Sequence, residues 1–545
     1  MTSFTSRVTT VIVDANVRTL NSHMPTADAV AFAGAEIAAV GSRDEIMGLA
    51  SSTTEVISMD GATVTPGLID SHIHPVWGAE LTAGINLDGL TDLAAVRAAI
   101  RAEAEKVRAR NDGSWVRGWN LDYAVFDGTS IAGSLIEDAA MGQPAAFTFY
   151  DLHTAVATRA ALDASGIDRA REFTDASSIV VDASGTPTGE LREPTAYNLV
   201  LDAAPSPTHD QELTRARAVL DGLAATGLTG GVIMDGTLTT LDLLAELERS
   251  APLPVRLDVA LWHGPGRDDR GVAEYVALRD AAGQRWKCGL IKLFSDGVID
   301  TGTAWLYEPD ACGHGLDSFW PDPQRFVDVV RAYDDAGFQI ATHAVGDKAV
   351  GAVLDAYEKL GPRPSGQPRH RIEHLETVTD ADVARMATAG VTASMQPLHM
   401  QWRQADGSDS WATRLGTARS DRAFRIVDMI RAGAAVTLGS DWPVAQSDPR
   451  IGMAWARARR TPGVPDAPVF EPDQALTAEQ AISGYTSWAA AALGDSRRGR
   501  IAPGCRADLT AFSADPFDIS PDDLIDLPIA MTVVDGQITH RAESS

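Results

Sequence analysis

The sequence of 545 residues is poor in cysteine and in basic residues. Its three cysteines, Cys288, Cys312 and Cys505, are far apart and form no CxxC pair, which argues against a disulfide framework and against a thiolate zinc site. A reducing, cytoplasmic location is therefore expected. Only 46 Lys and Arg accompany 74 Asp and Glu, and the net charge of -28 disfavours nucleic acid and anionic membranes as partners. Small molecules remain the expected partners.

Long hydrophobic runs are also missing. The N-terminal residues "MTSFTSRVTTVIVDANVRTL" contain an apolar stretch of only a few residues, and no later run reaches membrane length. We therefore expect neither a signal peptide nor a spanning helix.

The two ends of the chain share a pattern of short, β-rich segments separated by turn residues. Residues 8–66 show it first, and "GRIAPGCRADLTAF" and "IAMTVVDGQITHR" repeat it near the other end. Because isolated strand pairs are marginally stable, we expect residues 1–66 and 496–545 to combine into one composite β-sandwich.

The middle of the chain, residues 67–495, repeats a helix pattern, a glycine stop and an apolar strand, as in "FVDVVRAYDDAGFQIATHAVGD". This repetition predicts an α/β fold with a (β/α)8 TIM-like barrel, and an open doubly wound sheet is the alternative. Residues from about 110 to 195 break the repetition, and we expect them to form an insertion that caps the barrel mouth.

Two histidines stand one residue apart in "GLIDSHIHP", residues 67–75. Alternate residues of a strand project to the same side, so His72 and His74 would point the same way from a strand end. Two imidazoles in this arrangement can hold one metal ion.

Further polar residues close apolar runs and are expected at the carboxyl ends of barrel strands: Lys292 in "GLIKLFSDG", His343 in "IATHAVGD", His374 in "RIEHLE" and Asp441 in "VTLGSDWP". Each has an ordinary structural interpretation. The histidines could be hydrogen-bonded core residues, Asp441 a turn or helix cap, and Lys292 the partner of Asp296. A barrel brings strand ends to one rim, so the set as a whole favours a single site.

Four other residues are candidates for substrate contact: His153 in "DLHTAV", Trp305 and Tyr307 in the loop after Lys292, and His399 in "QPLHMQW". Ordinary packing or solvent exposure explains each of them equally well.

Over nearly its whole length the chain resembles the amidohydrolase superfamily of metal-dependent hydrolases (amidohydrolase family 3). It is most similar to the YtcJ-like branch, which includes N-substituted formamide deformylases. The resemblance rests on "TPGLIDSHIHP", "IKLFSDG", "IATHAVGDKAV", "RIEHLE", "LGSDWPV" and "GRIAPGCRADLTAF". It implies that His72, His74, His343 and His374 bind metal, that Lys292 is a carbamylated bridge of a binuclear centre, and that Asp441 binds metal and moves protons.

The resemblance also implies a reaction, which is hydrolysis of a non-peptide carbon–nitrogen bond in a small amide, such as an N-substituted formamide. Imidazole and carboxylate ligands suit zinc first, and manganese, iron or nickel also fit, as one ion or two. A same-fold hydrolase of esters, lactones or cyclic amides is one alternative. A non-enzymatic relative is the other. The family leads us to expect a homodimer.

Overall fold

The computed structural model describes residues 7–126, 129–150, 154–173, 177–361, 363–364 and 367–542. The chain divides into two compact units. One consists of Met1–Pro75 with Arg217–Ser545, and the other is Val76–Ala216. The predicted insertion of about 110–195 lies inside the second unit. Within the described ranges, no helix combines the length and the apolarity needed to cross a membrane.

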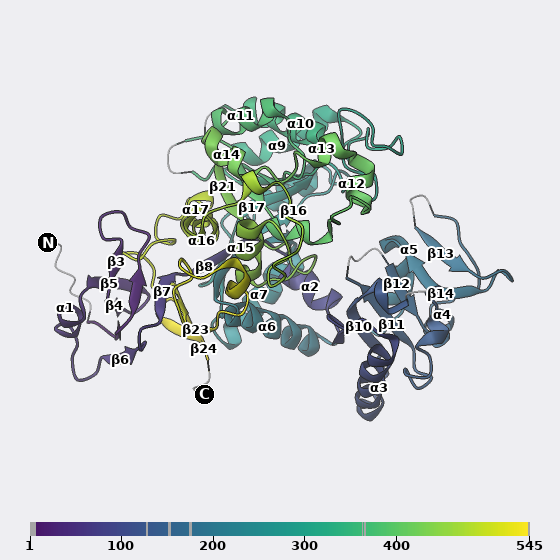
Figure 1. Ribbon diagram of the computed structural model, residues 1–545, viewed down its shortest axis with the longest axis horizontal. Helices are drawn as coiled ribbons and strands as arrows, with labels where there is room; N and C mark the ends of the chain where they lie inside the picture. Colours follow the sequence, from purple (N-terminus) through teal and green to yellow (C-terminus); the bar gives the residue numbers. More distant parts are fainter. Residues whose placement is uncertain are drawn as a thin grey trace. The chain divides into compact units, whose positions relative to one another are not determined.

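Eight parallel strands form the central sheet of the first unit, and Figure 1 labels β8, β16, β17 and β21 among them. The strand order is β21-β20-β19-β18-β17-β16-β15-β8. They are β8 (Leu68–Ile73), β15 (Leu228–Gly236), β16 (Arg256–Trp262), β17 (Trp286–Phe294), β18 (Gln339–Ala344), β19 (Arg371–His374), β20 (Thr392–Met395) and β21 (Ala435–Leu438). The two outer strands meet, since Ile73 bridges to Trp442 and the Asp441 amide donates to the His72 carbonyl over 2.7 Å. The sheet is therefore nearly closed into the predicted TIM-like barrel.

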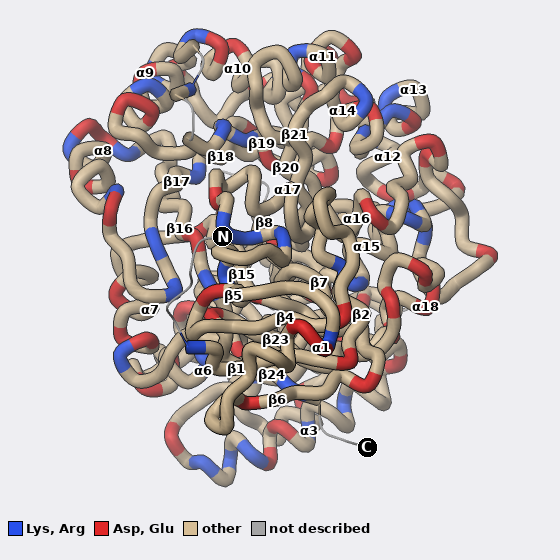
Figure 2. The backbone as a smooth tube through the Cα atoms, turned by 90° about the vertical axis from the view of Figure 1, so that its left-hand side faces the viewer, with Lys and Arg blue, Asp and Glu red and all other residues tan. Residues whose placement is uncertain are grey.

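Helices follow the barrel strands, and local sequence explains where they begin and end. They include α7 (Leu238–Ser250), α8 (Asp269–Val276), α9 (Pro323–Asp335), α10 (Asp347–Glu358), α11 (Asp380–Thr388), α14 (Ile426–Ala432) and α17 (Ser487–Ala492). Asp322 caps the start of α9, and Gly337 (φ 82°) follows its end. Phe326, Val330 and Tyr333 repeat at helical spacing and are buried. Figure 2 shows acidic and basic residues interspersed along these outer helices.

Strands from the two chain ends share a sheet in the first unit. Its order is β24 (Gln537–Arg541), β23 (Ile529–Val534), β22 (Leu509–Phe512), β7 (Thr63–Pro66), β2 (Asn16–Arg18) and β3 (Thr26–Ala27). β7 and β22 pair antiparallel, as the sequence pattern predicts for the two ends. A smaller sheet contains β5 (Glu36–Gly41), β4 (Ala29–Ala33), β1 (Thr10–Val13) and β6 (Glu55–Ser58). One apolar cluster includes Phe32 of the smaller sheet and Val64 and Leu509 of the larger one.

The second unit contains its own sheet and core. The strand order is β13 (Ser178–Val181), β14 (Pro187–Arg192), β12 (Thr154–Ala157), β11 (Ala145–Phe149), β10 (Val116–Leu121) and β9 (Ile85–Asn86). Helix α3 (Leu93–Arg110) buries Val96, Ile100 and Val107 in a cluster with Phe147 and Phe149. Its expected role as a cap of the barrel stays a prediction.

Candidate metal centre

The six predicted ligand residues all lie at or just beyond the carboxyl ends of barrel strands, and all are buried. His72 is in β8 and His74 follows it, Lys292 is in β17, His343 in β18, His374 ends β19, and Asp441 follows β21. The barrel thus brings together residues from five strands, as the positions of these residues after apolar runs predict.

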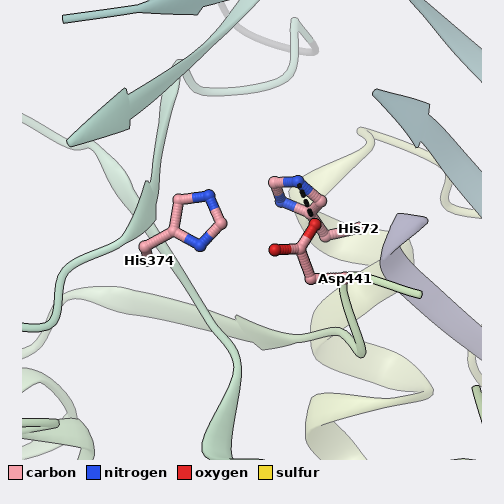
Figure 3. Close-up of side chains that lie close together, drawn as sticks. All are labelled: His72, His374 and Asp441. Carbon is pink, nitrogen blue, oxygen red and sulfur yellow. Dashed lines mark ion pairs between the residues drawn. The ribbon is translucent and has the colours of Figure 1, made fainter. Parts of the chain in front are cut away.

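Three of these side chains form a compact group. One ligand atom each of His72, His374 and Asp441 lies within 4.8 Å of the other two. Figure 3 shows the three side chains converging from different parts of the barrel, with an ion pair between His72 and Asp441. Nε2 of His72 lies 3.2 Å from Oδ1 of Asp441. This spacing would let a single cation contact all three groups.

A hydrogen bond to a buried carboxylate fixes the orientation of the His72 ring. Its Nδ1 donates to Oε2 of Glu373 over 2.8 Å, and Arg371 holds the same carboxylate through Nε at 2.6 Å. Burial and the neighbouring Lys292 lower the pKa of His72 to about 4, so the ring is neutral at pH 7. With the hydrogen on Nδ1, Nε2 is the nitrogen able to bind a metal.

His74 is held between two carboxylates. Its Nε2 lies 3.0 Å from Asp441 Oδ1, and its Nδ1 lies 3.4 Å from Asp235 Oδ1. Burial alone would lower the pKa of His74, but hydrogen bonds to Asp235 and Asp441 outweigh it and raise that pKa to about 9. Burial opposes the charge on Asp441, yet the surrounding histidines hold its pKa well below the usual range. Asp441 is therefore an ionised ligand candidate.

Lys292 is completely buried beside His72, with Nζ 3.3 Å from Nε2 of that ring. Burial lowers the pKa of Lys292 to about 8. Among the described residues it forms no ion pair with Asp296, the structural partner that the sequence left open. Asp296 instead accepts hydrogen bonds from the backbone amides of Trp305, Val345 and Gly346 at 2.8, 3.1 and 2.8 Å.

His343 stands next to His374, with ring centroids 4.4 Å apart. Its Nε2 donates to the carbonyl of Gly297 over 3.0 Å. Burial and Lys292 lower the pKa of His343 to about 3, so this ring is neutral as well. Nδ1 is then the nitrogen that remains able to accept a metal.

Of the residues predicted to contact substrate, one lies at the cluster of candidate ligands and two lie away from it. His399, in η3 (Pro397–Trp402), lies at the cluster, with Nε2 3.6 Å from Asp441 Oδ2 and its ring 5.9 Å from that of His374. Trp305 and Tyr307 do not join it. The Trp305 ring lies under Lys348 and lines a separate cavity of about 190 Å³. The Tyr307 amide bonds to Asp347 and its side chain is 53% exposed. His153 lies outside the described residues.

Backbone geometry at the site is unusual. His374 and Asp441 adopt positive φ angles of 76° and 62°, which non-glycine residues rarely do. Nearby, β8 and the end of β21 approach so closely that a Cβ on Gly439 would lie 2.7 Å from the His72 amide nitrogen. Uncommon backbone angles of this kind concentrate at functional sites.

Two residues that the sequence did not suggest belong to the cluster. Asp235 near the end of β15 closes the apolar run "GGVIMDG", the same signal that identified Lys292. Glu373 precedes His374 within the quoted "RIEHLE". An acidic residue next to a predicted ligand, such as Glu373 next to His374, is a candidate hydrogen-bond partner for a metal-binding imidazole.

Sequence comparison assigns the chain to a family. The amidohydrolase family profile matches residues 55–540. The chain belongs to the amidohydrolase family. YtcJ of Bacillus subtilis (strain 168) is 30% identical over 507 residues, covering 90% of this chain and 91% of that protein. The N-substituted formamide deformylase of Arthrobacter pascens is 29% identical over 549 residues, covering 98% and 99%.

Solved structures agree on the fold. An uncharacterized metal-dependent hydrolase from Pyrococcus horikoshii OT3 superposes with a TM-score of 0.74 at 21% identity, covering 94% of this chain and 99% of that one. This member of the amidohydrolase family carries a candidate metal site made of two histidines and an aspartate. Neutral imidazoles and an ionised carboxylate are ligand types that fit a divalent ion.

Proposed function

We propose that this amidohydrolase cleaves a carbon–nitrogen bond, other than a peptide bond, in a small amide such as an N-substituted formamide. The observation that carries the proposal is the convergence of His72, His374 and Asp441 within 4.8 Å at the carboxyl ends of the barrel strands. The 29% identity with a formamide deformylase along almost the full length supports the choice of substrate.

The residues around this group suit two divalent ions, with zinc the first choice. His72, His343, His374 and Asp441 would hold them, with Lys292 between. His74 would join them on losing the proton that Asp235 and Asp441 stabilise. A buried lysine cation is costly, and the lowered pKa of Lys292 favours the neutral amine that reacts with carbon dioxide. A carbamate there would turn a cation into an anionic oxygen ligand. This change removes the cost of burying an ammonium next to neutral imidazoles.

A divalent ion bound by these residues would supply a water molecule of lowered pKa and a Lewis acid for the carbonyl of the amide. The chain supplies the proton transfers. Asp441 takes a proton from the attacking water as its oxygen bonds to the carbonyl carbon, and then gives that proton to the leaving nitrogen as the carbon–nitrogen bond breaks. The products are a carboxylic acid, formic acid for a formamide, and an amine. His399, 3.6 Å from the second carboxylate oxygen of Asp441, helps to orient this group.

The test is a substrate panel with metal-loaded protein that contains N-substituted formamides, other small amides, esters, lactones and cyclic amides. Amides should be hydrolysed, with activity lost on chelation and restored by zinc or manganese. Asp441→Asn should lower kcat by at least about a hundredfold, because it removes the proton carrier. Turnover of esters, lactones or cyclic amides alone would favour the same-fold alternative. Metal-loaded protein that hydrolyses nothing would favour a non-enzymatic relative, and chelator-resistant amide hydrolysis would exclude the proposed mechanism.

A further inference from the structure

Two aromatic residues lie beside the metal ligands and have no part in holding them. Trp262 is the last residue of β16, and Phe294 is the last residue of the neighbouring strand β17. Their ring centroids are 5.3 Å apart, with an angle of 31° between the ring planes. Trp262 is 46% exposed, whereas Phe294 is half-buried. A single exposed tryptophan means little by itself, so its position relative to the ligands decides its significance.

Strand register places this pair on the ligand-bearing face of the sheet. Trp262 pairs with Lys292, and Phe294 pairs with His343. Paired residues of adjacent strands project to the same face, as do residues two apart in one strand. Trp262 therefore shares the inner face of the barrel with Lys292. The next residue, His263, confirms the alternation, because it bonds to Tyr333 of the surrounding helix α9 over 2.8 Å.

Side-chain contacts join the pair directly to the centre. The Phe294 ring stacks on His343 with centroids 4.7 Å apart and an angle of 23°. Nζ of Lys292 lies 4.7 Å from the centroid of the same ring. An apolar wall thus runs from the exposed Trp262 ring through Phe294 to the side chains that would hold the metal. Flat rings pack favourably against such a surface and add to affinity beyond the area that they bury.

We propose that Trp262 and Phe294 form a specificity wall that receives a flat, apolar group of the substrate, such as an aryl ring attached to the scissile amide. This inference rests on the metal centre of the proposed function. It narrows the substrate class to small amides with an apolar substituent, and it assigns Trp262 a role in binding rather than in bond cleavage.

The test measures binding, so it needs no turnover. Benzohydroxamate and acetohydroxamate share a metal-binding head and differ in a phenyl or a methyl group, and calorimetry on zinc-loaded protein gives both dissociation constants. The wild type should bind benzohydroxamate at least about tenfold more tightly. Trp262→Ala should lose most of that preference, Trp262→Phe should keep most of it, and acetohydroxamate affinity should stay unchanged in both variants.

Tyr307→Ala is the matched control, because Tyr307 is an exposed aromatic residue outside the cluster. It should keep the full preference for benzohydroxamate. The inference would be overturned if the wild type bound both hydroxamates equally well. It would also be overturned if Trp262→Ala, with an unchanged melting temperature, kept the preference for benzohydroxamate. Neither result would count against the metal centre. Failure of acetohydroxamate to bind zinc-loaded protein would overturn the metal centre, and the inference with it. Absence of amide hydrolysis would count against the proposed reaction alone.

Discussion

The imidazole of His72 donates its Nδ1 hydrogen to the carboxylate of Glu373 over 2.8 Å. Arg371 binds that carboxylate through Nε at 2.6 Å and Nη2 at 3.0 Å, and all three side chains are buried. Arg371 also donates to the carbonyl of Ser71, in the strand that carries His72. The arginine and the glutamate together fix which nitrogen of His72 faces Asp441. Carboxylates that hold a metal-binding histidine in this way tune its affinity for the ion.

Glu373→Gln should weaken metal binding by about 10- to 100-fold, because an amide accepts less strongly from His72 and can present either end to it. Loss of the carboxylate also leaves the buried Arg371 guanidinium without its anionic partner. The free energy of unfolding should therefore fall by about 3 kcal/mol. Competition with a chromophoric chelator, under conditions where the variant is folded by circular dichroism, measures the affinity. Glu479→Gln, an exposed change in the first turn of α16 (Ala478–Gly484), is the control. Unchanged metal affinity in Glu373→Gln would show that His72 needs no such support.

Metal loading should depend on bicarbonate and on pH through Lys292. Carbon dioxide reacts with the neutral amine, and burial lowers the pKa of Lys292 to about 8 in the metal-free protein. The neutral fraction should be roughly 1% at pH 6 and about half at pH 8, so carbamate formation should increase as the pH rises. Carbon-13 NMR with labelled bicarbonate should show a carbamate signal that Lys292→Ala lacks. A metal content that depends on neither bicarbonate nor pH would contradict a carbamate bridge.

Gly439→Ala should damage the closure of the barrel. The added Cβ would lie 2.7 Å from the His72 amide nitrogen and 2.9 Å from Oδ1 of Asp70, which are groups with little freedom to move. We expect a loss of about 1–3 kcal/mol in the free energy of unfolding, together with weaker metal binding. Gly222→Ala is the matched control, because it meets nothing within 4 Å in the exposed part of helix α6 (His209–Ala225) and should stabilise by about 0.5–1 kcal/mol. Denaturant titration of both variants measures these effects. A Gly439→Ala variant as stable as the wild type would show that β8 and β21 can move apart.

The barrel could be predicted because its signals are local and repeated. One example is helix α9, whose apolar residues recur at helical spacing. Gly337, with a positive φ, ends the helical segment, and the apolar run of strand β18 follows. The pairing of β7 with β22 was also predictable, since both chain ends show the same pattern of short strands and an isolated pair of strands is marginally stable. The bounds of the second unit were harder. Val76–Ala216 begins directly after the predicted metal-binding motif, where no change in composition marks the transition.

The positions of the candidate ligand residues at strand ends were predictable for a different reason, which is that polar side chains at the ends of apolar runs stand out. Asp235 also closes an apolar run but was not predicted as a site residue. Glu373 was not predicted either, because only the histidine of its motif was considered as a ligand. Trp262 could not be recognised, because its significance depends on register with Lys292, and strand register is not written in a single sequence. The loop positions of Trp305 and Tyr307 likewise depend on tertiary contacts, here with Asp296 and Asp347.

The most direct test of the metal centre is elemental analysis of the purified protein, produced with zinc and manganese in excess, beside the Lys292→Ala variant. We predict about two divalent ions per chain in the wild type and a sharp fall in the variant, because Lys292 would bridge the two ions. One ion that survives the substitution would contradict the bridge and leave a single-metal site at His72, His374 and Asp441. No bound metal in the wild type would contradict the account as a whole.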